Sequence, residues 1–139
     1  MKYLVPVFLI ATGAPPALAM DLQPFHMPSG NIHCLFITDE GQSSVECDLR
    51  SRSTTRPALP QPADCDLEWG DRFALGANGK PGLVCHGDTL FSPDSPVLAY
   101  GKTMTWKSSI ACTAAKSGIT CKNRQGHGFS LSRSKQRMF

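Results

Sequence analysis

Six cysteines, grouped as three pairs along the chain, constrain the fold more than any other feature. The pairs are Cys34 and Cys47, Cys65 and Cys85, and Cys112 and Cys121. Around the first and third pairs, apolar and polar residues alternate on both sides of a glycine-containing turn, a pattern typical of a β-hairpin. This density of cysteines is natural for a chain that matures in an oxidising compartment.

The first hairpin makes a testable prediction about its register. If Glu40 and Gly41 form the tip of the turn, counting outward places Cys34 opposite Cys47 and apolar residues opposite apolar residues. Opposed β-carbons in an antiparallel pair lie about 4.5–5.5 Å apart, close enough for a disulfide. A bulge at Gly41 would shift this register by one residue.

The third pair of cysteines follows the same pattern. A turn over residues 116–118 places Cys112 opposite Cys121. Gly118 can adopt the positive φ that a type I turn with a bulge requires. The chain therefore uses one device twice, although the matched stretches are too short to distinguish an internal repeat from similar patterning.

The middle cysteines are predicted to pair by elimination. A proline-rich stretch over residues 56–63 precedes Cys65 and excludes a central strand or a helix there. Strands over residues 71–75 and 83–85 follow it. Six cysteines can pair in several ways, so the choice depends on the two hairpin registers. The expected disulfides are Cys34–Cys47, Cys65–Cys85 and Cys112–Cys121.

The remaining segments predict little helix, since no later stretch has apolar residues spaced three and four apart. Residues 87–100 are expected to run along the surface and residues 104–106 to lead into the last hairpin. Residues 128–131 should form a closing strand, and the basic residues 133–137 should fray. The predicted fold is all-β, a small antiparallel sandwich or open barrel of disulfide-bridged hairpins.

The first nineteen residues match a secretion signal. Lys2 supplies the positive start, residues 4–11 an apolar stretch, and residues 17–19 (Ala-Leu-Ala) a cleavage site. The apolar stretch is too short to span a bilayer, and no later segment approaches roughly 18 apolar residues. We therefore expect a signal peptide over residues 1–19, a single β domain over residues 20–139, no transmembrane segment, and a periplasmic or secreted location.

Charge is divided unevenly along the chain. All eleven acidic residues and five basic residues lie between residues 20 and 100, whereas residues 101–139 contain eight basic residues and no acidic one. Two interpretations are open. The basic third forms a face for a polyanion, or an acidic half packs beside a basic half within one domain.

Several short motifs follow one another along the chain in a recognisable order. They are Pro28-Ser29-Gly30-Asn31-Ile32 with Cys34, Tyr100-Gly101, Thr120-Cys121 with Asn123, and Gly126-His127-Gly128-Phe129. Over residues 25–139 this order resembles a family of small exported bacterial proteins catalogued as a domain of unknown function. The resemblance implies export and a disulfide-bonded β domain, and it assigns no catalytic or binding residue. Ala99 departs from it, where a proline is expected.

His127 is the most tempting single residue for chemistry. Gly126 and Gly128 leave its imidazole uncrowded, as a general base or a metal ligand requires. The alternative is structural, with the glycines forming a tight bend that His127 fixes, and it is favoured because no nucleophile or carboxylate lies at a diagnostic spacing. Asn123 with the two glycines is also a candidate anion nest.

Metal and cofactor sites are not expected. His33 and His86 adjoin cysteines, but oxidised cysteines cannot bind zinc as thiolates, and strand alternation points both histidines away from them. The acidic residues 64–71 lack the glycine-placed loop of a calcium motif.

Aromatic residues suggest a second kind of site. Trp69, Trp106 and Tyr100 are candidates for a platform that binds sugars or peptides, although packing is the commoner role of such rings. The nearby acidic residues 66–71 do not define a glycosidase pair, because that requires a known separation. No hydrolase or phosphate-loop motif is present.

These observations predict an exported, non-enzymatic binding module of unknown ligand. In one version it binds an anionic polymer of the cell envelope, and a purely structural envelope component is the default. The candidate binding residues are Lys122, Arg124, His127, Arg133, Lys135, Arg137, Trp69 and Trp106. One alternative is an inhibitor of a secreted hydrolase such as a lysozyme, because stiff bridged domains lose little entropy on binding. Another is a hydrolase or metal-dependent enzyme that uses His127 with Asp88 or His86.

Overall fold

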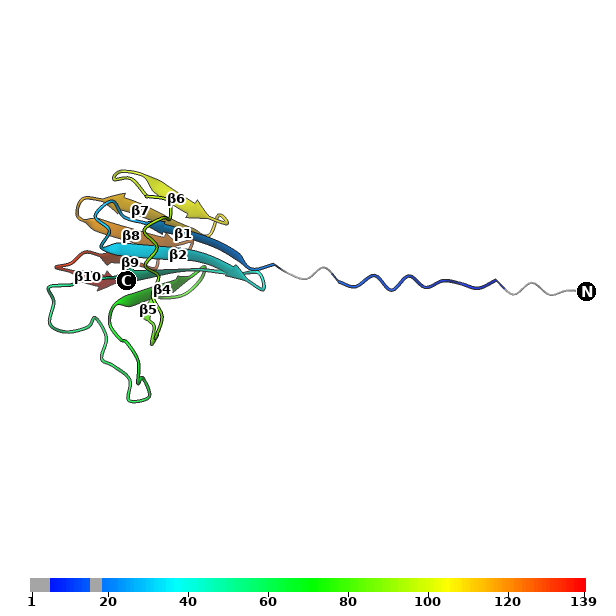
Figure 1. Ribbon diagram of the computed structural model, residues 1–139, viewed down its shortest axis with the longest axis horizontal. Helices are drawn as coiled ribbons and strands as arrows, with labels where there is room; N and C mark the ends of the chain where they lie inside the picture. The colour runs from blue at the N-terminus through cyan, green and yellow to red at the C-terminus, as the bar shows by residue number, and fades with distance from the viewer. Residues whose placement is uncertain (1–5, 16–18) are drawn as a thin grey trace, which may run out of the picture.

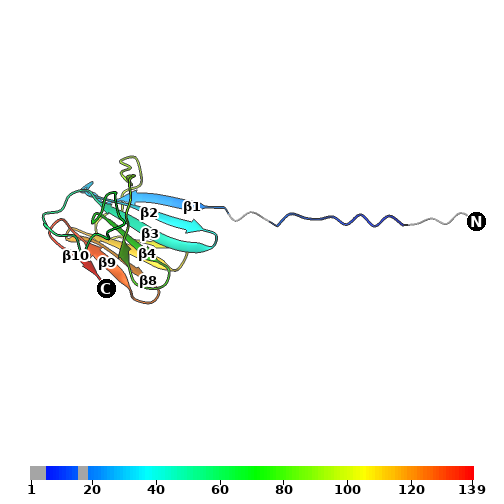
Figure 2. The same ribbon diagram turned by 90° about the horizontal axis from the view of Figure 1, so that it is seen from below.

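The computed structural model describes residues 6–15 and 19–139, and in them ten strands form two antiparallel sheets that face each other (Figures 1 and 2). The first sheet contains β1 (Asp21–His26), β2 (Ile32–Asp39), β3 (Gln42–Leu49), β4 (Arg72–Gly76) and β5 (Gly82–Leu83). The second contains β6 (Thr103–Trp106), β7 (Ile110–Ala115), β8 (Gly118–Asn123), β9 (Gly128–Leu131) and β10 (Gln136–Met138). The predicted all-β sandwich is confirmed, and the strands do not close into a barrel.

Both sheets follow one plan. In each sheet the disulfide joins the second and third strands, and a phenylalanine on the fourth strand lies opposite the second cysteine. The row across the first sheet is Phe25, Cys34, Cys47, Phe73 and Leu83. The row across the second sheet is Met104, Cys112, Cys121, Phe129 and Met138. The repeated hairpin is therefore part of a larger repeated arrangement of five strands.

These rows form the interior of the sandwich. Phe73 and Phe129 are fully buried, and their ring centroids lie 5.9 Å apart across the two sheets. At one edge, Trp106 stacks on Phe36 with a centroid separation of 5.5 Å. Apolar side chains point inward and polar ones outward because successive strand residues face opposite sides of a sheet.

All three predicted disulfides are confirmed. Cys34–Cys47 and Cys112–Cys121 lie directly across their hairpins, each with Cα atoms 4.1 Å apart, in the registers that the sequence predicts. Cys65–Cys85 joins a long loop, which projects from the sandwich between β3 and β4, to the segment after β5 (Figure 1). No cysteine is free.

The edges of the sheets differ from the prediction. Residues 133–137 do not fray, because β10 pairs with β9 and Met138 lies opposite Phe129. Strand β1 was not predicted, and the returning strand predicted at residues 83–85 is confined to β5. Edge strands form one hydrogen-bonded ladder and bury few side chains, so their sequences alternate weakly; β1 even contains Pro24, which is tolerated at an edge.

The segment before the sandwich is extended. Residues 6–15 are exposed, contain no strand or helix, and lead away from the sheets (Figure 1). Lys2 and most of the predicted cleavage site lie outside the described residues. In the part of the chain that the structure describes, no helix is long and apolar enough to cross a membrane.

Candidate functional site

Residues 87–99, which we call the strap, cross part of the outer face of the first sheet and end beside β1. Its backbone is bound to side chains of the sheet. The Leu90 N–H donates to Asp48 Oδ2 at 2.8 Å, and the Ser92 N–H donates to His33 Nδ1 at 3.1 Å. Both acceptors are at most 5% exposed, so the strap covers the part of the face that contains them.

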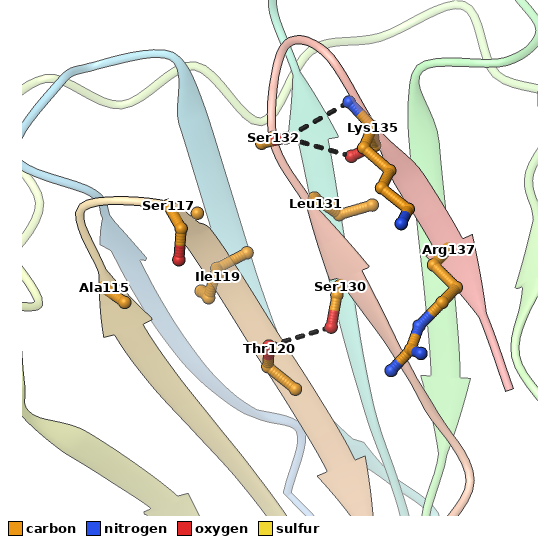
Figure 3. A pocket seen from close by; sticks show the side chains of 10 residues that line it. Ala115, Ser117, Ile119, Thr120, Ser130, Leu131, Ser132, Lys135 and Arg137 are labelled. Atoms are coloured by element: carbon orange, nitrogen blue, oxygen red, sulfur yellow. Dashed lines mark hydrogen bonds between the residues drawn. The ribbon is translucent and has the colours of Figure 1, made fainter.

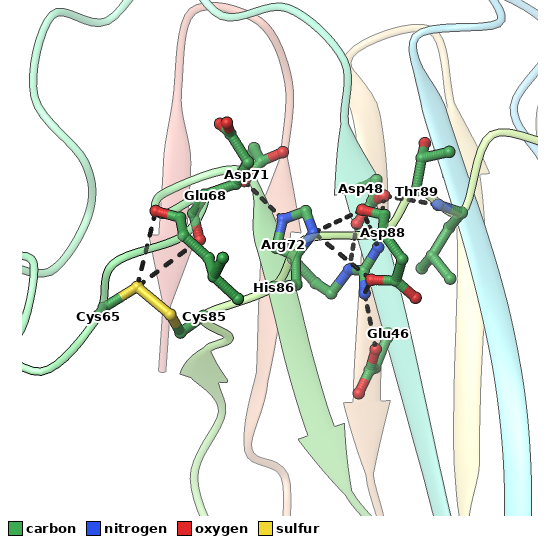
Figure 4. Close-up of polar contacts among 12 residues, drawn as sticks. Glu46, Asp48, Cys65, Glu68, Asp71, Arg72, Cys85, His86, Asp88 and Thr89 are labelled. Carbon is green, nitrogen blue, oxygen red and sulfur yellow. Dashed lines mark hydrogen bonds and ion pairs between the residues drawn. A yellow bond between two sulfur atoms is a disulfide. The ribbon is translucent and has the colours of Figure 1, made fainter.

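A paired charge cluster lies beneath the strap (Figure 4). The Arg72 guanidinium is buried and donates from Nε and Nη2 to both oxygens of Asp48, and from Nη1 to Asp88 Oδ1 at 2.7 Å. Burial alone would lower the pKa of Arg72, but these carboxylates outweigh it and raise the pKa above its usual value. Burial raises the pKa of Glu46, which lies 3.7 Å from the guanidinium and is only partly compensated by it. The cluster binds the strap to the sheet.

His86 belongs to the same cluster. Its Nε2 lies 2.9 Å from Asp71 Oδ1, and its Nδ1 lies 2.7 Å from the carbonyl oxygen of Asp88. Burial lowers the pKa of His86, but these two oxygens favour the protonated ring and raise the pKa above its usual value. Among the described residues, no hydrogen bond or ion pair joins His127 to His86 or Asp88, and no group of three or more ligand-type side chains is placed to hold a metal ion. The structure gives the enzyme alternative no assembled site.

Acid is expected to loosen the strap through His33. Its Nε2 donates to the carbonyl oxygen of Gly30 while Nδ1 accepts the Ser92 N–H, so the ring is neutral in this arrangement. Burial lowers the pKa of His33, and the charges of His26 and Arg50 act in the same direction. A histidine whose pKa is lower in the folded state stabilises fully above its unfolded value of about 6.5. This contribution is lost as pH falls through that value toward the folded pKa.

Hydrogen exchange at the Ser92 amide measures this loss. We expect protection of the amide to fall as the pH drops through about 6.5, after correction for the intrinsic exchange rate. His33→Gln is the control, because it removes the titrating ring and should flatten the pH profile. His86 acts in the opposite direction, since its stabilising contribution is present in acid and lost as pH rises through its raised pKa. A profile that His33→Gln leaves unchanged would contradict the prediction.

The turn that contains His127 is a structural clamp. Buried Asn123 accepts the N–H groups of Gln125 and His127 at Oδ1 and donates from Nδ2 to the carbonyl oxygens of Gly76 and Gly79 on the first sheet. The backbone N–H groups of the proposed anion nest, those of Asn123, Gly126 and Gly128, likewise donate to carbonyl oxygens of the protein. Asn123 therefore fastens the two sheets together at this end.

The glycine directly after His127, Gly128, is required by the close approach of a neighbouring strand. A Cβ atom at Gly128 would lie 1.9 Å from the carbonyl oxygen of Cys121, an impossible contact. The side chain of His127 is half-buried. This geometry favours the structural interpretation of the Gly-His-Gly element.

The two tryptophans do not form a common platform. Trp106 donates from Nε1 to Thr38 Oγ1 at 2.9 Å, in the edge strand β6. Trp69 donates to the carbonyl oxygen of Leu59 at 2.9 Å, within the long loop. Each indole has a packing role, and the structure does not bring the two rings together.

Within residues 6–15 and 19–139, no segment like the strap crosses the outer face of the second sheet. A row of small polar side chains crosses it, with hydroxyl contacts at 2.7 Å and 2.9 Å. The row is Thr103, Thr113, Thr120 and Ser130, and Arg137 on β10 lies at its end. Where the first sheet has strap-binding side chains, the second has different residues at matching registers. Ala111 replaces His33, Lys122 replaces Asp48, and Gly128 replaces Arg72.

Basic side chains border this open face. Lys122, Lys135 and Arg137 are exposed, and we call the surface that they and the hydroxyl row form the basic face. A pocket of about 260 Å³ lies on it, the face pocket (Figure 3). Lys135 and Arg137 line this pocket together with Ser130 and Thr120, and no carboxylate lines it.

Further pockets adjoin the face pocket at one end of the sandwich, and together we call them the end groove. This end groove consists of two adjoining pockets of about 430 Å³ and 320 Å³, which share Ser29 and Asn31. It meets the face pocket at Ser117, Gly118 and Ser132, which line both. The other residues of the groove that the argument uses are Arg50, Tyr100, Lys116 and Arg133. No acidic side chain lines the path.

The structure thus brings together part of the predicted set. Lys122, Lys135 and Arg137 share the basic face, and Arg133 lies in the end groove. Arg124 lies at the β8–β9 turn, in a different pocket with Lys107. Sequence reasoning missed Arg50 and Lys116. The only available signal for Arg50 was its place directly after a predicted hairpin strand.

Comparison with known proteins gives one match. A family model described as a family of unknown function, DUF6636, matches residues 4–139. No curated protein and no solved structure matches the chain. The match spans both sheets, the strap and the end groove.

Proposed function

The chain belongs to DUF6636, a family of unknown function, and we propose that it is an exported, non-enzymatic module whose basic face binds an anionic polymer of the cell envelope. The observation that supports this most is the contrast between the two outer faces. On the first sheet, Asp48 and Arg72 are paired under a strap. On the second sheet, exposed cations border an uncovered hydroxyl row with no carboxylate. A surface of one sign attracts and concentrates a ligand of the opposite sign.

Export is supported by the cysteines. All six form disulfides, which persist in oxidising compartments and are rare in the cytosol. The extended, exposed segment over residues 6–15 agrees with a cleavable signal. We propose the periplasm or the cell exterior as the location.

Neutralising the basic face should weaken polyanion binding about tenfold at moderate salt, because each lost cation removes a salt-linked contact. The test variant is K122Q/K135Q/R137Q, and the probe is fluorescently labelled heparin. The slope of log affinity against log salt concentration should fall by about 1 for each cation that contacts the polymer.

A control variant with the same change in net charge shows whether the polymer binds at the basic face or is attracted by the net charge of the whole protein. R56Q/K107Q/R124Q replaces three exposed cations that line neither the face pocket nor the end groove, and it should change affinity by less than about twofold. Equal losses in the two variants, or no loss in either, would refute the proposed face. Circular dichroism spectra of both variants show whether the fold is retained.

A further inference from the structure

We infer that the ligand is a linear acidic polysaccharide that runs from the basic face through the end groove to Arg50, with one sugar ring stacked on Tyr100. This inference rests on the proposed function and specifies its ligand class. Its first support is continuity, because the face pocket and the two parts of the end groove share lining residues. A chain-like ligand can therefore follow one path without leaving the surface.

The cations are distributed along this path rather than gathered at one point. Lys135 and Arg137 lie at one end, Lys116 and Arg133 in the middle, and Arg50 at the far end. Such spacing suits a polymer with a charge on successive units better than a small anion, which needs converging donors. No carboxylate side chain lines the three pockets, so no side chain there repels a negatively charged unit of the polymer.

The groups between the cations suit sugars. Serine hydroxyls and the Asn31 amide line the groove, and hydroxyl groups both donate and accept hydrogen bonds, as sugar hydroxyls require. Tyr100 is the one aromatic residue along the path, and it is 39% exposed. Single-stranded nucleic acids need several aromatic rings for successive bases. One isolated ring with many hydroxyls favours a polysaccharide.

The far end of the path is rigid. The Arg50 guanidinium lies 4.0 Å from the ring centroid of Phe91 in the strap, which fixes its position. Asn31 accepts the Ser51 N–H at 2.9 Å and donates to the Ser51 carbonyl oxygen at 3.1 Å. The groove walls are therefore ordered before the ligand arrives, which reduces the entropy lost on binding.

Binding should depend on the length of the ligand. Galacturonate oligosaccharides of two, four and eight units are the probes, measured by isothermal titration calorimetry. Affinity should rise about tenfold or more from the shortest to the longest, because contacts at separate points along one chain reinforce each other. Arg50→Gln should weaken only the longest oligosaccharide, and Arg56→Gln, in the long loop, should weaken none.

Tyr100 distinguishes a sugar from a simple polyanion. Tyr100→Ala should weaken the eight-unit oligosaccharide about tenfold, Tyr100→Phe should preserve binding, and polyphosphate of similar charge should bind both variants equally. If affinity is independent of length, or if Tyr100→Ala affects both probes alike, the inference fails. The proposed function would then still stand on the heparin result, and it fails if the K122Q/K135Q/R137Q variant binds heparin normally or if the control variant loses as much affinity.

Discussion

Replacing Arg72 with alanine should destabilise the fold by about 3–5 kcal/mol, since breaking one side of a buried ion pair leaves an uncompensated charge. The Arg72 side chain is 4% exposed and that of Asp48 is 7% exposed. Without Arg72, the Asp48 carboxylate keeps only the N–H of Leu90 as a donor. Urea unfolding monitored by tryptophan fluorescence measures the loss.

Two further variants test whether the loss of stability comes from the buried Arg72–Asp48 pair. Arg56→Ala removes an exposed arginine and should change stability by no more than about 0.5 kcal/mol. Arg72→Met combined with Asp48→Leu should recover much of the loss, because hydrophobic replacement of both members of a buried pair is often neutral. An Arg72→Ala protein as stable as the wild type would show that the cluster does not support the fold.

The same substitution should also release the strap. Arg72 donates to both the side chain and the carbonyl oxygen of Asp88, which lies at the start of the strap. Hydrogen exchange at Leu90 and Ser92 should therefore increase more than exchange in the second sheet, whose core does not contact the cluster. The charge cluster and the strap thus form one structural unit on the first sheet. The basic face lies on the other sheet, away from this unit.

The hairpins could be predicted because their information is local. Cys34 and Cys47 are separated by one turn, so alternation along the two strands determines which side chains face each other. The same holds for Cys112 and Cys121. In both cases one register places every apolar residue opposite another, and a slip by one residue would turn them to the wrong face.

The charge cluster and the strap could not be predicted because their contacts join distant segments. Asp48, Arg72 and Asp88 come from three separate parts of the chain. The strap has no alternation of its own, and it is bound largely through backbone N–H groups that any residue supplies. Nothing in its sequence distinguishes it from a loop in solvent.

The sequence identified some residues of the proposed binding path but not their arrangement. Counting charges identified the basic residues near the end of the sequence, including Lys135 and Arg137. The end groove, however, forms only when the turn over residues 27–32 meets the turns over residues 116–118 and 132–134. Arg50 joins this groove from the acidic part of the sequence, so charge counting assigned it to the wrong group.

Truncating either central phenylalanine should destabilise the sandwich as strongly as losing Arg72. Phe73→Ala or Phe129→Ala should each cost about 3–5 kcal/mol, since a buried ring leaves a cavity in a close-packed core. Leu22→Ala is the control, because Leu22 is 52% exposed and should cost little. Urea unfolding measures all three.

The two phenylalanines should also be energetically coupled, because each is the other's neighbour across the sheets at 5.9 Å. Leucine substitutions keep the double variant folded and allow a double-mutant cycle. Phe73→Leu and Phe129→Leu together should cost at least about 0.5 kcal/mol less than the sum of the single changes, because the second truncation removes a contact that the first has already weakened. Strict additivity would mean that each sheet packs independently of the other. The two sheets would then be stabilised separately. The shared interior that holds them together, and with it the end groove between their turns, would contribute little to stability.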